Sequence, residues 1–147
     1  MMQEVSIYIS ISNASPKALR RRYGYVLSCD IGGSTYTKEY FGEKEATRYQ
    51  VILIAMGEAL NHLTKPCQVK IYPEDPFIVT MANRLEEWAG AGWKNSQGKP
   101  IANVREWKVI YNHKKTRRIE CLQGKHAFSD WLTDQMSKNG AAYSNYA

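Results

Sequence analysis

Two adjacent carboxylates, Glu74 and Asp75, follow a short apolar run with the composition of a β-strand, residues 68–72. Open α/β folds place their chemistry beyond the carboxyl ends of such strands. Carboxylate oxygens there are suitable ligands for a divalent cation. The pair therefore suggests an acidic metal site. A structural alternative is equally simple, because Asp75 stands just before Pro76 and is placed to cap a following helix.

Basic side chains are the second group of residues that could take part in function. Twenty Lys and Arg against 14 Asp and Glu give a formal charge of +6. The pI is about 9.2. Such a balance favours polyanionic partners, nucleic acid above all. One cluster comprises Lys17, Arg20, Arg21 and Arg22, and a second comprises Lys114, Lys115, Arg117 and Arg118. The alternative reading of either cluster is an ordinary solvated face.

The length and the cysteines limit the class of protein. A chain of 147 residues suits one domain with a substantial core. No apolar run approaches the roughly 18 residues that span a bilayer, and no signal-peptide pattern opens the chain. Cys29, Cys67 and Cys121 form no closely spaced pair, and their odd number argues against a disulfide framework. These features predict a cytoplasmic protein without a membrane association.

Hydrophobic periodicity predicts the elements that must position these groups. Strands are expected at residues 5–11, 23–29, 34–41, 68–72 and 117–122. Helices are expected at residues 42–63, 76–88, 103–113 and 128–136. The first helix is apolar on nearly every side and should be buried, with Glu43 and Glu45 in its opening turn, where the helix dipole favours acidic residues. Trp107 should pack inward, and a place in the core is one alternative for Trp88. Residues 1–138 are expected to form one domain, and residues 139–147 a flexible tail.

This order of elements suggests a three-strand antiparallel meander followed by parallel crossovers. At this point particular residues resemble the type 1 ribonuclease H family. Thr47-Arg48-Tyr49-Gln50 resembles the family's start to its first helix. The spacing of Gly92-Trp93-Lys94, Lys99-Pro100, Asn103-Val104 and Trp107 is similar to its basic protrusion, and Gly124 with His126 to its glycine-histidine loop. The resemblance covers about residues 3–138. It implies an α/β fold with a five-stranded mixed sheet flanked by helices.

The family cuts the RNA strand of RNA–DNA hybrids with four carboxylates that hold two Mg²⁺. The resemblance places these carboxylates at Ser10, Gln50, Glu74 and Asp134, with Asp130 one helical turn before Asp134. Two of the four positions are therefore neutral. A unit-charge pair at 4 Å contributes roughly 4 kcal/mol at an effective dielectric of 20, so this loss should cripple binding of two metal ions. We expect no cofactor, the alternative being Mg²⁺ or Mn²⁺ held weakly by Glu74 and Asp134.

The resemblance also implies which residues do the work. Glu74, Asp134 and His126 are the expected residual catalytic residues, although His126 has an alternative as an ordinary loop histidine. Nucleic-acid contacts are expected from Trp88, Trp93, Lys94 and Lys99 of the protrusion and from Arg20, Arg21 and Arg22. The leading hypothesis is a domain that binds RNA–DNA hybrid or duplex with little or no hydrolysis. The alternatives are a divergent active ribonuclease H and a protein-interaction module with a protein partner.

Overall fold

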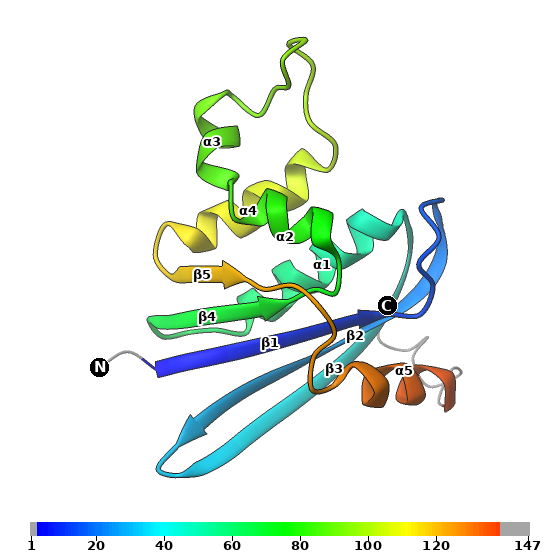
Figure 1. The fold of residues 1–147 in the computed structure, drawn as a ribbon, viewed down its shortest axis with the longest axis vertical. Helices are drawn as coiled ribbons and strands as arrows, with labels where there is room; N and C mark the ends of the chain where they lie inside the picture. Colours follow the sequence, from blue (N-terminus) through cyan, green and yellow to red (C-terminus); the bar gives the residue numbers. More distant parts are fainter. Residues whose placement is uncertain (1–2, 139–147) are drawn as a thin grey trace.

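One five-stranded mixed sheet, in the order β3-β2-β1-β4-β5, organises the chain (Figure 1). The computed structural model describes residues 3–138. The strands are β1 (Gln3–Ile11), β2 (Leu19–Ile31), β3 (Ser34–Ala46), β4 (Cys67–Tyr72) and β5 (Arg118–Cys121). The first three strands pair antiparallel, and β4 and β5 add in parallel to β1. The predicted α/β architecture, a meander followed by parallel crossovers, is confirmed.

Helices cover both faces of the sheet (Figure 1). They are α1 (Arg48–Asn61), α2 (Pro76–Ala82), α3 (Leu85–Gly90), α4 (Val104–Lys114) and α5 (Ser129–Lys138). Helix α1 lies against β1 and β2 and beneath α4. Helix α5 lies on the opposite face, where Leu132 and Met136 pack on Val26 of β2. The sheet is therefore a central layer between two unequal layers of helix.

The main core lies between the sheet and α1. Ile7 and Ile9 of β1 are fully buried, as the period-two pattern predicts. Helix α1 buries eight of its residues, which explains its almost continuous apolar composition. Trp107 of α4 is 2% exposed, so its predicted place in the core is confirmed.

The start of the first helix differs from the prediction. Residues 42–46 belong to β3, and α1 begins at Arg48 with Thr47 as its N-cap and no acidic residue in its first turn. Glu43 is opposite Arg22 in the strand register, and its carboxylate lies 2.8 Å from Nε of Arg20. Cross-strand charge pairing on a long hairpin therefore holds these acidic residues in the sheet, in place of their predicted interaction with the helix dipole.

The predicted helix 76–88 is interrupted. Helix α2 ends at Ala82, and α3 begins at Leu85. Between them, the side-chain amide of Asn83 donates to Cys121 O and accepts from Cys121 N–H on β5, both at 3.1 Å. These two bonds tie the interruption to the edge of the sheet. Helix α3 and the segment that joins it to α4, residues 85–103, project away from the sheet as a protrusion (Figure 1).

Within residues 3–138, no helix is long and apolar enough to cross a membrane. The predicted tail, residues 139–147, lies outside the described residues.

A substitution at Gly42 of β3 would test how tightly the β2–β3 hairpin packs on the core. A Cβ at Gly42 would lie 2.8 Å from Cε1 of Tyr23 and closer still to its Cζ and Oη. Tyr23 cannot retreat cheaply, because it is buried and its hydroxyl donates to Glu58 at 2.7 Å. We expect Gly42→Ala to lower the free energy of unfolding by about 1–3 kcal/mol, measured by urea denaturation.

Gly90→Ala is the matched control, since a Cβ at Gly90 would meet no atom within 4 Å. It should leave stability unchanged or raise it by up to about 1 kcal/mol. Equal stabilities for the two variants would contradict the packing described at Gly42.

Candidate functional site

Glu74 stands just beyond the carboxyl end of β4, beside the end of β1. Its backbone is left-handed, with φ of 61°, a conformation that non-glycine residues adopt infrequently and often at functional sites. Its Oε1 accepts a hydrogen bond from the buried hydroxyl of Ser10 on β1. The same oxygen lies 3.0 Å from Nε2 of His126, in the loop before α5. Ser10, Glu74 and His126, far apart in the chain, thus meet in the structure.

His126 is held rigidly in this position. Its side chain is fully buried, and its ring packs 5.2 Å from that of Tyr8. Nδ1 accepts the Phe128 N–H at 3.1 Å, so the ring hydrogen lies on Nε2. Nε2 points at both Glu74 and the Ile9 carbonyl oxygen, 2.9 Å away. The imidazole therefore fastens the loop before α5 onto β1 and β4.

Ser129 is a site residue that the sequence analysis missed. It opens α5, is buried, and accepts the His126 N–H at 2.8 Å. Its side chain also hydrogen-bonds Glu74. A signal was available: a polar side chain in the first turn that reaches back to an N–H three residues earlier is a capping pattern.

The electrostatics of Glu74 follow from these contacts. Burial opposes ionisation of the carboxyl, but hydrogen bonds from His126, Ser10 and Ser129 outweigh it and hold its pKa below the ordinary value of 4.5. Glu74 is therefore an anion near neutral pH, held by hydrogen bonds from the side chains around it.

Gln50, at the second predicted carboxylate position, faces α4. Its Nε2 donates to Oε1 of Glu106 in the first turn of α4, at 3.0 Å. Glu106 was not anticipated, because nothing in the sequence indicates that the two helices meet there. Gln50 therefore holds α1 to α4 through a hydrogen bond to a carboxylate.

Asp134 points away from Glu74. The buried face of α5 carries Ser129, Leu132 and Met136, whereas Asp134 is exposed and pairs with Lys138 at 2.9 Å. Asp134 follows Ser129 by five residues, or about 500° of helix rotation. The two side chains are therefore about 140° apart around the helix axis. Asp130 is also exposed. The structure therefore places Ser129, and neither aspartate, against Glu74.

Asp75 caps helix α2 and pairs with an arginine. Its Oδ1 accepts the Ile78 N–H at 3.0 Å and caps α2, and its Oδ2 lies 2.6 Å from the Arg48 guanidinium. The side chain is 2% exposed. The helix-capping alternative for Asp75 is thus the one observed.

The three consecutive arginines have different environments. Arg21 is buried, and its guanidinium donates to the backbone carbonyls of Asn13, Ser15 and Lys17, which fixes the loop after β1. Arg22 donates to Met136 O at 3.1 Å and ties β2 to α5. Arg20 is exposed and paired with Glu43. Of the three, Arg20 alone offers an exposed guanidinium. Arg21, predicted to contact nucleic acid, is instead part of the interior.

The protrusion presents its lysines outward and its tryptophans inward. Lys94 and Lys99 are exposed. Trp93, in left-handed backbone, packs edge-on against Tyr111 of α4 with ring centroids 5.5 Å apart. Trp88 is partly buried and lines a pocket between the protrusion and α2. The cationic side chains of this segment are thus the ones that face solvent.

Comparison with known proteins decides the family. The family model for RNase H matches residues 3–127. The chain belongs to the ribonuclease H family. A ribonuclease H of Cupriavidus metallidurans is 32% identical over 120 residues, covering 80% of this chain and 79% of that protein. A ribonuclease H of Lachnoclostridium phytofermentans is 37% identical over 92 residues, covering 60% of this chain and 58% of that protein.

Solved ribonuclease H structures share the fold. LC9-RNase H1, described as a type 1 RNase H with the type 2 active-site motif, superimposes with a TM-score of 0.76 at 18% identity, over 96% of this chain and 74% of its own. The PFV RNase H domain gives a TM-score of 0.66 at 16% identity, over 98% and 96% of the two chains. At these identities the likeness concerns the fold.

The depressed pKa of Glu74 predicts a pH dependence. A carboxyl whose pKa is lower in the folded state stabilises the fold above its unfolded-state value, and that contribution is lost as the pH falls through the folded value. We expect Glu74→Gln to lower the free energy of unfolding by about 1–3 kcal/mol at pH 7. The gap from the wild type should shrink below pH 4.5, the ordinary value. Urea denaturation across pH 3–7 measures it, and a constant gap would contradict the assignment.

Proposed function

We propose that this ribonuclease H domain binds RNA–DNA hybrid or related duplexes and has little or no metal-dependent hydrolysis. One observation carries the proposal. The carboxylate of Glu74 faces Ser10, His126 and Ser129, none of which supplies a second anion.

The charge at the site supports weak metal affinity. Mg²⁺ demands an octahedral set of hard oxygen ligands, with carboxylates supplying the negative charge. Two closely spaced ions, the arrangement that the resemblance implies, need several such anions. Among residues 3–138, no three His, Cys, Asp or Glu side chains gather in a way that could hold a metal ion. The donor set around Glu74 does not fit a pair of divalent cations.

Binding is supported by the surface and by the fold. Lys94 and Lys99 are exposed on the protrusion, and the chain carries a formal charge of +6. Lysines contact phosphates without reading sequence. A foamy viral protease-reverse transcriptase that shares this fold at 16% identity was solved with an RNA/DNA hybrid, with a TM-score of 0.61. These points favour duplex binding through backbone phosphates.

A second candidate is an active, divergent ribonuclease H. The 32% identical relative carries that name, and Glu74 remains an anion that one metal ion could use. The two candidates differ in whether the chain cleaves a hybrid. A protein-interaction module would be the conclusion if no nucleic acid bound even at low salt.

A cleavage assay with an end-labelled hybrid in Mg²⁺ and then Mn²⁺ separates the candidates. We expect cleavage no greater than in a reaction with Glu74→Ala, because a single carboxylate cannot hold two ions. Wild-type cleavage that Glu74→Ala abolishes would overturn the proposal.

The restoring arm of this experiment uses Ser10→Asp, Gln50→Glu and Ser129→Asp together. Glu106→Gln must accompany them, because Gln50→Glu alone would set a new carboxylate against Glu106, whose Oε1 lies 3.0 Å from the present Gln50 Nε2. Calorimetry should detect Mg²⁺ binding in this variant and not in the wild type. If the restored variant stays metal-free while folded, the positions assigned to the lost carboxylates are wrong.

Salt dependence tests the binding surface. We expect the logarithm of the affinity for a hybrid to fall linearly with the logarithm of the salt concentration. Lys94→Ala and Lys99→Ala should each reduce that slope by about one. Lys38→Ala, an exposed lysine on the β2–β3 hairpin, is the control and should leave the slope unchanged. Fluorescence anisotropy measures the affinities, and equal slopes for all three variants would remove the protrusion from the interface.

A further inference from the structure

We propose that the pocket between the protrusion and helices α1, α2 and α4 receives a single unstacked nucleobase, so that the domain prefers nucleic acid with an unpaired base. The inference rests on the proposed function, because it assigns the pocket to part of the same ligand.

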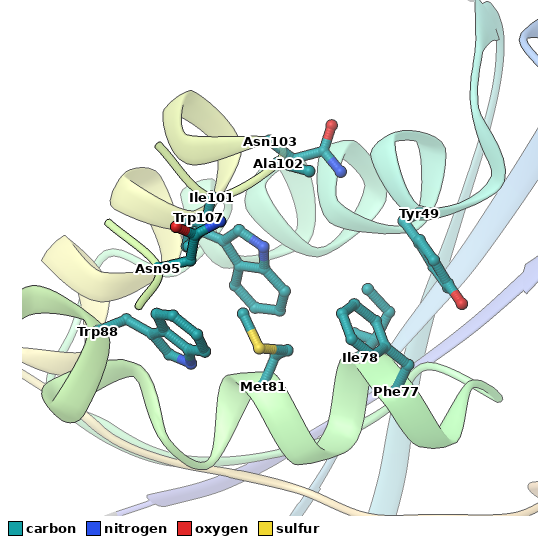
Figure 2. A pocket seen from close by; sticks show the side chains of 10 residues that line it. All are labelled: Tyr49, Phe77, Ile78, Met81, Trp88, Asn95, Ile101, Ala102, Asn103 and Trp107. Carbon is teal, nitrogen blue, oxygen red and sulfur yellow. The ribbon is translucent and has the colours of Figure 1, made fainter. Parts of the chain in front are cut away.

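The pocket has the size and the lining for a planar ring. Its volume is about 350 Å³, near the lower end of the roughly 300–1,000 Å³ of ligand sites. Half of the ten side chains that line it are aromatic or contain sulfur: Tyr49, Phe77, Met81, Trp88 and Trp107 (Figure 2). Tyr49 and Phe77 lie with their ring centroids 4.8 Å apart on one side of it. Aromatic walls of this kind stack bases that have left their helix.

Trp88 brings an unsatisfied donor to this region. Its Nε1 is buried and has no hydrogen-bond partner among the described residues. A buried unpaired N–H is costly, so native structures seldom leave one without a reason. Every nucleobase carries acceptor oxygens or ring nitrogens. Because this N–H is covered by protein atoms, a base in the pocket would become its partner once the Trp88 ring turns toward the pocket.

The rim is polar and cationic where a nucleotide backbone would pass. Asn95 and Asn103 lie at the pocket. Asn95 accepts from the Lys99 N–H at 3.1 Å, which fixes the loop that carries Lys94 and Lys99. Asn103 has left-handed backbone and makes no side-chain cap of α4, so its amide stays available. Arg105, two residues after Asn103, is exposed in the first turn of α4. Amides at the rim and cations around it suit a base with its attached phosphates better than a purely apolar molecule.

The test compares three hybrids: an intact one, one with a single bulged base, and one whose bulge is abasic. The abasic bulge has a similar kink and backbone without the ring. We expect the wild type to bind the base bulge roughly tenfold more tightly than the abasic bulge, as stacking of one base implies. With 2-aminopurine as the bulged base, binding should quench its fluorescence.

Two substitutions locate the effect. Ala102 is exposed and lines the pocket, so Ala102→Trp should fill the mouth and abolish the tenfold difference. Ala102→Ser leaves the mouth open and should preserve it. Trp88→Phe keeps a ring but removes the donor, and should reduce the difference by about fivefold, the equivalent of one neutral hydrogen bond.

The outcomes separate this inference from the proposed function. If the wild type binds the intact hybrid but does not distinguish the two bulges, the pocket inference is wrong and duplex binding stands. If Ala102→Trp retains the tenfold difference, the base is bound elsewhere and the inference is also wrong. If no hybrid binds at low salt, the proposed function itself fails.

Discussion

A partly buried carboxylate at the junction of three elements is the constraint on which the site depends. Glu74 follows β4, Ser10 belongs to β1, and His126 and Ser129 lie before and within the first turn of α5. An anion removed from water is tolerated only when hydrogen bonds replace its hydration. The fold therefore has to bring hydrogen-bond donors to this point, and in doing so it fixes α5 against the face of the sheet opposite α1.

The proposed loss of carboxylates at Ser10 and Gln50 is compatible with a stable ribonuclease H fold. Several carboxylates in one place repel one another unless cations neutralise them. Ser10 and Ser129 remove that repulsion and add hydrogen bonds to the remaining anion. Gln50 acts similarly toward Glu106 on α4. Glu74 and its neighbours thus form a local hydrogen-bond network that stabilises the tertiary structure.

Much of the fold, and the family, could be predicted from the amino-acid sequence. Alternation in β1 and the apolar α1 predicted the buried layers, and the spacing around Gly92 and Trp107 predicted the family. The errors arose where long-range contacts outweigh local preference. Glu43 and Glu45 suit a helix start, but they lie in β3 beside the arginines of β2. Asp134 suited the fourth carboxylate by type, yet the rotation of α5, set by Leu132 and Met136, turns Ser129 toward Glu74. Helix rotation and side-chain direction depend on packing that no local pattern specifies.

The side-chain amide of Asn83 has a further consequence for how this domain behaves beside other molecules. Strand β5 is one border of the sheet, and an unpaired border invites the strand of a neighbouring chain. Asn83 occupies both backbone groups of Cys121, as a pairing strand would. The other border, β3, carries alternating lysines and glutamates, which discourage pairing. Both borders of the five-stranded sheet therefore carry features that discourage pairing with the edge of another sheet.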